Sequence, residues 1–136
     1  MNIVRLDHLV LTVMDVEKTC AFYCGVLGMK RMTFGEGRTA LHFGHQKINL
    51  HAFDWDYYLK AQTPTPGSAD LCFIVDVAVD EWATELLDKE IELIEGPVKR
   101  TGAAGPLRSI YFRDPDGNLI ELSNALTGEE EEEEED

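Results

Sequence analysis

The sequence is poor in positive charge. It has 12 lysines and arginines against 26 aspartates and glutamates, which gives a formal net charge of −14. Residues 129–136 hold eight of these acids, and residues 1–128 without them carry −6. Proteins that bind DNA or RNA present clustered lysine and arginine to the phosphates. No such cluster is evident in this sequence, so we predict that the protein does not bind nucleic acid.

Long apolar runs are missing as well. No stretch approaches the roughly 18 apolar residues that a membrane-spanning helix needs. The first seven residues lack the basic start and the apolar stretch of a signal peptide. We therefore predict a soluble, cytoplasmic protein without a membrane partner.

Cysteine is scarce and odd in number. Cys20, Cys24 and Cys72 form no C-x-x-C pair, and an odd count argues against a disulfide framework. The simplest interpretation is three reduced, at least partly buried side chains in a reducing compartment.

What the sequence does have is a pattern that occurs twice. Each half begins with a β-branched and aliphatic strand, continues with an amphipathic helix, and ends with three more strands. Asp15 and Asp80 are the expected helix caps, and Gly28 is placed to end the first helix. The expected elements of the first half are residues 8–13, 16–27, 30–34, 39–43 and 47–52, and those of the second half are 70–75, 80–89, 91–94, 109–113 and 118–123.

The repeat suggests one α+β domain over residues 1–128. Its modules cover about residues 4–53 and 68–125, and a connector rich in proline and aromatic residues covers 54–67. An acidic tail, which we expect to be disordered, covers 129–136. Glycines and prolines in residues 96–106 predict a loop. Repeated units of this kind usually bury a shared surface by pairing.

Four polar residues stand at related places in the repeat. We align His8 with Asp70 in the first strands, and His51 with Glu121 in the last strands. Alternation of side chains along a strand turns all four away from the helix side. Two imidazoles and two carboxylates suit a divalent metal. Solvated surface groups are the alternative for each residue, and Asp70 could instead cap its strand.

Three stretches of the sequence carry a resemblance to a known family: residues 7–13 (DHLVLTV), 22–29 (FYCGVLGM) and 111–121 (YFRDPDGNLIE). They resemble the vicinal oxygen chelate superfamily, which is also called the glyoxalase/bleomycin-resistance/dioxygenase superfamily. The resemblance covers about residues 4–125. Within the superfamily, residues 46–51, 66–72 and 96–103 look like glyoxalase domain-containing protein 5 and related small bacterial proteins.

This resemblance implies paired βαβββ modules that form a cupped mixed sheet around a divalent metal. The ligands that it implies are His8, His51, Asp70 and Glu121, and the metal could be Ni, Co, Zn, Mn or Fe. It also implies a homodimer in which the two chains could share each metal site. Glutathione or another thiol is a candidate co-substrate.

The implied chemistry is that of a glyoxalase-type lyase or isomerase. The metal holds adjacent oxygens of a small substrate and stabilises an enolate or similar oxyanion. Glu121 is the first candidate for the base, and Asp70 the second. Arg38 and Arg108 are candidates to hold an anionic group of the substrate, and solvated surface charge is the alternative for each. The alternatives to a lyase are an extradiol-type dioxygenase, a non-catalytic protein that binds a small molecule or antibiotic, and a thiol transferase of the fosfomycin type.

Overall fold

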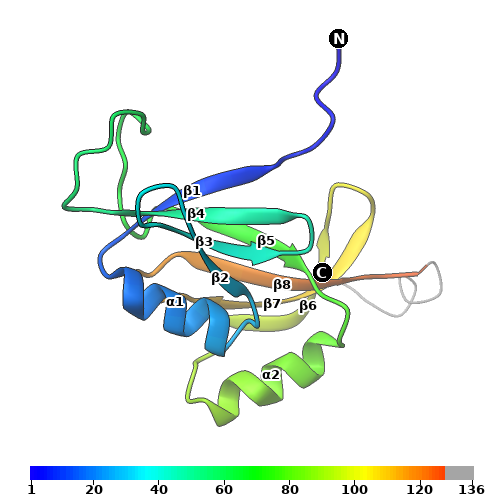
Figure 1. Ribbon diagram of the computed structural model, residues 1–136. Helices are drawn as coiled ribbons and strands as arrows, with labels where there is room; N and C mark the ends of the chain where they lie inside the picture. The colour runs from blue at the N-terminus through cyan, green and yellow to red at the C-terminus, as the bar shows by residue number, and fades with distance from the viewer. Residues whose placement is uncertain (128–136) are drawn as a thin grey trace. The chain divides into compact units, whose positions relative to one another are not determined.

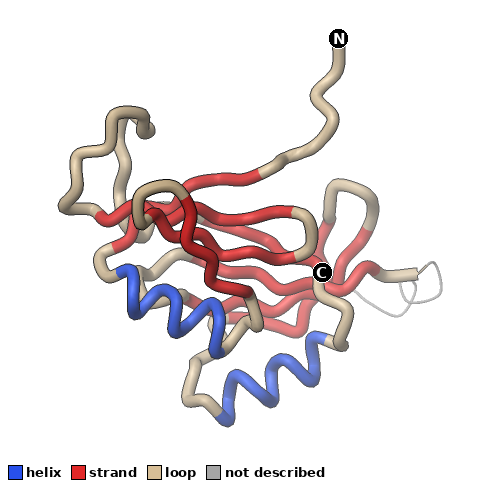
Figure 2. Tube along the Cα trace, in the orientation of Figure 1, coloured by secondary structure: helices blue, strands red, loops and turns tan. Residues whose placement is uncertain are grey.

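The computed structural model describes residues 1–127, and the acidic tail predicted at 129–136 lies outside the described residues. The chain divides into two compact units. The first unit comprises residues 1–69 and 115–117, and the second comprises residues 70–114 and those from 118 onward. Each unit contains a helix and a four-stranded sheet in its described part, as Figure 2 shows. The twofold strand–helix–three-strand pattern and the α+β class are thus confirmed.

The first unit forms a mixed sheet with strand order β1-β4-β3-β2 (Figure 1). β1 runs parallel to β4, and the pairs β4–β3 and β3–β2 are antiparallel. The helix α1 contacts β2, β3 and β4. The bounds are β1 (His8–Val13), α1 (Val16–Gly25), β2 (Lys30–Phe34), β3 (Arg38–Phe43) and β4 (Gln46–Ala52).

Local signals in the sequence set the ends of α1. The Asp15 carboxylate accepts a hydrogen bond from the Lys18 amide at 3.0 Å, as expected of an N-cap. Gly28 follows the helix at φ +76°, in the left-handed region that glycine reaches without strain. Tyr23, Leu41 and Ile48 are completely buried, and they form part of the core on the helix side of this sheet. Burying such side chains contributes about 1.5–3 kcal/mol each.

The second unit repeats the arrangement with strand order β5-β8-β7-β6. β5 runs parallel to β8, and α2 contacts β7 and β8. Ile110, Phe112 and Ile120 are completely buried. The bounds are β5 (Asp70–Ile74), α2 (Val79–Asp88), β6 (Glu95–Thr101), β7 (Pro106–Arg113) and β8 (Leu119–Ala125).

Three predictions about the second unit were wrong. The short strand expected at residues 91–94 is absent from the described chain, and β6 occupies residues that we expected to form a loop. Ladder partners on β7 hold this glycine- and proline-containing segment in the sheet, across an irregularity between Glu95 and Val98. Asp80 does not cap α2, because it lies inside the helix. The N-cap residue of α2 is Ala78.

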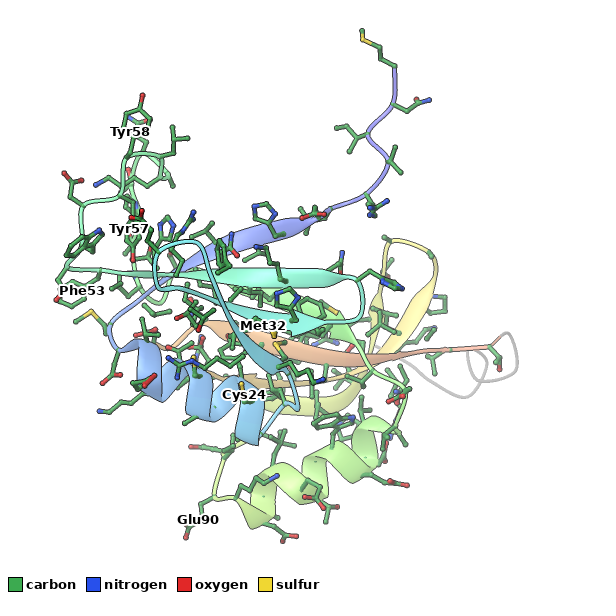
Figure 3. All side chains as sticks on the ribbon, in the orientation of Figure 1. Cys24, Met32, Phe53, Tyr57, Tyr58 and Glu90 are labelled. Carbon is green, nitrogen blue, oxygen red and sulfur yellow. The ribbon has the colours of Figure 1, made fainter. Side chains whose placement is uncertain are left out.

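A long loop follows β4 in the first unit. Figure 3 shows Tyr57 beside the end of β4 and Tyr58 farther out on the same loop. The Tyr57 hydroxyl accepts a hydrogen bond from the Ala52 amide at 2.9 Å. This bond anchors the inner part of the loop to the last residue of the strand. Among residues 1–127, no helix has the length and apolar content needed to cross a membrane.

Candidate functional site

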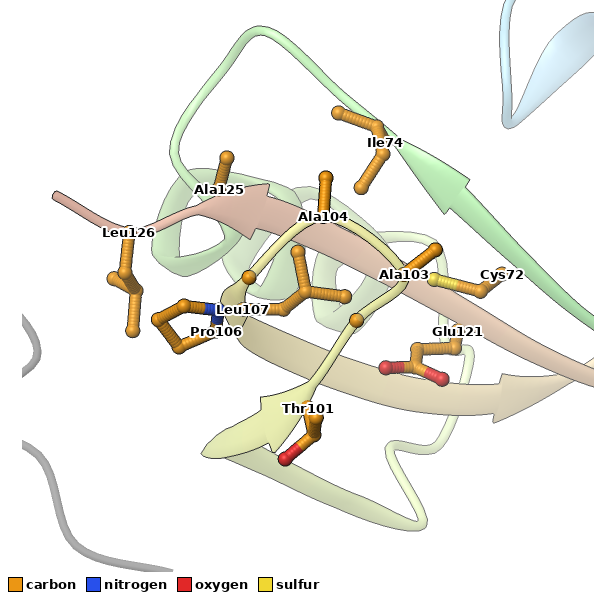
Figure 4. Close-up of a pocket in the computed structure, with 12 residues that line it drawn as sticks. Cys72, Ile74, Thr101, Ala103, Ala104, Pro106, Leu107, Glu121, Ala125 and Leu126 are labelled. Carbon is orange, nitrogen blue, oxygen red and sulfur yellow. The ribbon is translucent and has the colours of Figure 1, made fainter.

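A cavity of about 790 Å³ lies against the sheet of the second unit, on the side opposite α2 (Figure 4). β5, β8, the start of β7 and the loop after β6 form its wall. Most of the lining is aliphatic, with Cys72, Thr101 and Glu121 as the polar side chains. The aliphatic side chains come from Ile74, Ala103, Ala104, Pro106, Leu107, Ala125 and Leu126. A concave apolar pocket with few polar groups is the usual form of a small-molecule site.

Strand alternation places Glu121 at this cavity. Ile120 and Leu122 are buried on the helix side, so the residue between them faces the other way. Its ladder partners are Cys72 on β5 and Tyr111 on β7. Ser123 donates a hydrogen bond to Glu121 Oε2 at 3.2 Å, and the Tyr111 phenol forms another with this carboxylate. Burial and the negative charge of Glu121 raise the pKa of Tyr111, so the phenol keeps its proton.

A buried hydroxyl pair supports this carboxylate. Ser109 and Ser123 lie with their Oγ atoms 2.6 Å apart, and both residues are completely buried. The Cys72 thiol reaches the same Ser123 hydroxyl at 3.3 Å. Burial is the main cause that raises the pKa of Cys72, and the charges of Glu121 and Asp70 act in the same direction. Cys72 is therefore a protonated thiol at neutral pH, and not an activated nucleophile. The three cysteines are all free. The Cys72 residue as a whole is exposed, although its thiol is partly covered beside Ser123.

Asp70 begins β5 on the face that carries Cys72 and Glu121. It is paired with Leu119, so it lies diagonally across the β5–β8 ladder from Glu121. Diagonal neighbours of this kind lie about 7–8 Å apart between their Cα atoms. The second unit thus presents two carboxylates on one face, and hard oxygen donors of this type suit a divalent cation.

His8 in the first unit has the environment of a metal-binding histidine. Its Nδ1 atom lies 2.8 Å from the carboxylate of Asp7. This hydrogen bond is the main cause that lowers the pKa of Asp7. A carboxylate on one ring nitrogen fixes the tautomer and directs the other nitrogen, here Nε2, toward a ligand. The chemistry of His8 therefore fits a metal ligand.

His51 stands well apart from His8 on the same sheet. In the parallel β1–β4 ladder His8 is opposite Lys47, whereas His51 is opposite Thr12. At about 3.3 Å per residue, four positions correspond to about 13 Å along the strands. His51 is 5% exposed, and its ring stacks on Tyr57. The positions of the two imidazoles on the sheet do not favour one ion bound by both.

The ladders also correct our alignment of the two modules. His8 is paired with Lys47 and Asp70 with Leu119, so the counterpart of Glu121 is Asn49, and not His51. Asn49 is 5% exposed, and its Oδ1 atom is buried without a hydrogen-bond partner among the described residues. Asn49 and His51 share a face, so alternation could not distinguish them, and we did not select Asn49 from the sequence.

The two candidate arginines differ in their contacts. Arg108 forms a two-pronged ion pair with Asp80 of α2, with nitrogen–oxygen distances of 3.0 and 3.1 Å. This contact lowers the pKa of Asp80. Arg38 lies over the ring of Phe34, with its Cζ atom 4.8 Å from the ring centroid. In residues 1–127, no three His, Cys, Asp or Glu side chains come together as a group that could hold a metal.

Comparison with known proteins identifies relatives over most of the chain. Residues 5–122 match the Glyoxalase/Bleomycin resistance protein/Dioxygenase superfamily. Virulence protein STM3117 of Salmonella typhimurium is 55% identical over 123 residues, which are 90% of this chain and 85% of that protein. Its crystal structure matches with a TM-score of 0.90 and covers 93% of this chain and all of the solved one. Glyoxalase domain-containing protein RDO1 of Mycosarcoma maydis is 52% identical and covers 91% of this chain and 70% of that protein.

More distant matches have names that point to different activities. Metallothiol transferase FosB of Staphylococcus epidermidis is 25% identical over 90% of this chain and 82% of its own length. TnmS3, an antibiotic binding protein from Streptomyces, is also 25% identical, with a TM-score of 0.72 over 93% of this chain and 99% of its own. The finer likeness to glyoxalase domain-containing protein 5 stays a prediction.

Proposed function

Because the chain belongs to the glyoxalase/bleomycin resistance protein/dioxygenase superfamily, we propose that it is a divalent-metal-dependent lyase or isomerase of glyoxalase type. Its substrate in this proposal is a small molecule with adjacent oxygen atoms. The observation that carries the proposal is Glu121, held by Ser123 and Tyr111 at the wall of an otherwise apolar cavity. A carboxylate fixed in this way is suited to accept a proton from a bound molecule and return it.

The candidate metal ligands in this proposal are those that the sequence suggests, which are His8 and His51 in the first unit and Asp70 and Glu121 in the second. A bound divalent ion would act as a Lewis acid toward the substrate oxygens. The Asp7 carboxylate orients the His8 imidazole, and Asp70 and Glu121 supply oxygen donors from one face of the second sheet. His51 belongs to the ligand set that the sequence suggests. His51 lies four residues along the β1–β4 ladder from His8. We therefore expect metal affinity to depend less on His51 than on any other member of the set.

Glu121 is the proposed base and Asp70 the second choice. Proton transfer at a carbon next to a carbonyl needs a carboxylate with one oxygen fixed and the rest of the group accessible. Ser123 bonds Oε2 of Glu121, and the cavity adjoins the side chain. The Tyr111 phenol, which keeps its proton, lies beside the same carboxylate as its direct ladder partner on β7.

The two candidate arginines, Arg38 and Arg108, are not equally available to bind a substrate in this proposal. Arg38 remains a candidate to hold an anionic part of the substrate or of a thiol co-substrate such as glutathione. The ion pair with Asp80 occupies the guanidinium of Arg108, so a substrate role for Arg108 would require that contact to break.

Metal analysis and a catalytic assay together test the proposal. Purified protein is reconstituted separately with Ni, Co, Zn, Mn and Fe(II), and metal content is measured after gel filtration. Turnover of methylglyoxal with glutathione is then followed. We expect one ion per chain and a loss of about 10²–10⁴-fold in turnover for Glu121→Gln. Glu92→Gln, a change of the same type at an exposed position of this unit, should leave both unchanged.

Two results would count against the proposal. The first is the absence of any bound divalent ion after reconstitution, and the second is equal activity of Glu121→Gln and the unchanged protein. His51→Gln separates the ligand sets, because affinity should fall strongly for His8→Gln and little for His51→Gln. Light scattering at twice the 15.3 kDa chain mass would support the proposed homodimer.

A second candidate function is the non-catalytic binding of a small molecule or antibiotic. The aliphatic lining of the 790 Å³ cavity and the 25% identity to an antibiotic binding protein favour it. Saturable binding of an apolar compound that does not depend on metal or on Glu121 would support this candidate over the lyase. Oxygen uptake with a catechol would instead indicate the dioxygenase alternative.

A further inference from the structure

A row of nitrogen-bearing side chains crosses the first sheet on the face opposite α1. Each of the four strands contributes one member through directly paired positions, in the order His8, Lys47, His42 and Lys30. At about 4.8 Å between neighbouring strands, these positions span roughly 14 Å. We call these four residues the basic row.

The neighbouring positions confirm which face the basic row occupies. Arg31 follows Lys30 on β2 and so points to the opposite side, where it pairs with Glu17 of α1. Leu41 is paired with Arg31, and Ile48 is paired with Leu41. Both Leu41 and Ile48 are completely buried. The basic row therefore lies on the side of the sheet that α1 does not cover.

Two cations at this face gather around an aromatic ring. The Nζ atom of Lys47 lies 3.9 Å from the centroid of Phe34, and the Cζ atom of Arg38 lies 4.8 Å from it. Within residues 1–127, neither cation forms an ion pair with a carboxylate. The quadrupole of one ring balances only part of two positive charges. Their mutual repulsion leaves a positive potential that a bound anion would relieve.

The carboxylate at the other end of the face, that of Asp7, is already bonded to His8. A positive face is unusual in a chain with a formal charge of −14, so the general composition does not explain it.

We propose that Lys47 and Arg38, whose side chains meet at the Phe34 ring beside the basic row, form a binding site for an oxyanion, the phosphate or carboxylate group of a small molecule. Lysine supplies a point charge, and the guanidinium can hold two oxygens of one group at once. This inference rests on the proposed function in one respect, which is that the anion is part of the substrate or co-substrate. Binding of the anion itself needs no metal.

Titration of the metal-free protein with inorganic phosphate tests this site. The full chain is treated with a chelator and titrated at constant ionic strength, with amide and imidazole NMR signals as the readout. Sodium acetate forms a second arm, which distinguishes a preference for phosphate from one for carboxylate. We expect saturable shifts at Phe34, Arg38 and Lys47, and about tenfold weaker binding for Lys47→Gln and for Arg38→Gln.

Lys18→Gln is the matched control, because it removes one positive charge from α1 in the same unit. It should change anion affinity less than twofold. Non-saturable shifts with both anions, or equal weakening by Lys18→Gln and Lys47→Gln, would overturn the proposal. Since the protein is metal-free throughout, either outcome leaves the metal proposal to its own test.

Discussion

The imidazole of His51 lies flat against the phenol ring of Tyr57, with centroids 3.7 Å apart and ring planes 7° apart. His51 is nearly buried near the end of β4, and the stack joins it to the loop that follows this strand. Burial, followed by the charges of Arg38 and Lys60, lowers the pKa of His51 below its ordinary value of 6.5. The folded protein therefore favours the neutral ring.

Acid should destabilise the first unit through His51. As the pH falls through about 6.5, the unfolded chain takes up a proton at this residue before the folded chain does. The free energy of unfolding then falls with pH until the lower pKa of the folded state is passed, and changes no further below it. We expect the Tm to drop less between pH 7.5 and 5.5 in His51→Gln than in the unchanged protein.

His45→Gln is the control for this pH dependence. His45 lies in the exposed turn between β3 and β4, so its replacement should leave the pH dependence of the Tm as it was. A dependence that is the same in His51→Gln and the unchanged protein would show that His51 does not contribute.

Tyr57→Phe should loosen the loop after β4. The change removes the acceptor of the Ala52 amide but keeps the ring that covers His51. A partly buried hydrogen bond contributes about 0.5–1.5 kcal/mol, and chemical denaturation should show a loss in that range. Tyr57→Ala also exposes the imidazole, so the pKa of His51 measured by NMR should rise in that variant and stay nearly constant in Tyr57→Phe.

Asp80→Asn should weaken the attachment of α2 to β7. The two-pronged contact with Arg108 joins helix and strand, and the Asp80 side chain is 60% exposed. For such a solvent-screened pair we expect a loss of about 0.5–1 kcal/mol in the free energy of unfolding. Glu81→Gln removes an acid from the same helical turn without this partner, so it controls for the helix dipole. Equal losses in the two variants would refute a specific role for the ion pair.

Ser123→Ala should damage both stability and the candidate site. The buried Ser109 hydroxyl loses its partner, and Glu121 loses a donor. An unsatisfied buried hydroxyl costs about 1–3 kcal/mol. Ser68→Ala removes an exposed loop hydroxyl that donates to the Thr65 carbonyl, and it should cost less, about 0.5 kcal/mol. If Ser123 positions Glu121, the variant also shifts the pH profile of turnover, which a loss of stability alone would not do.

Much of the fold followed from short-range patterns. The alternation of buried and outward residues placed Glu121 opposite the helix. Asp15 and Gly28 marked the two ends of α1 because a side-chain cap and a left-handed glycine act within a few residues. Segment 95–101 was missed because its glycine and proline favour a loop locally, and pairing with β7 outweighs that preference.

The sequence by itself determined the two βαβββ modules, the family and the side of its own sheet on which each of His8, Asp70 and Glu121 lies, because these depend on residue type and on a period of two along a strand. The tertiary structure alone decided the register. Residues 49 and 51 point the same way, and the β1–β4 ladder makes Asn49 the counterpart of Glu121 and moves His51 four positions from His8. Strand pairing also assembled the basic row from four distant segments, which no local pattern encodes.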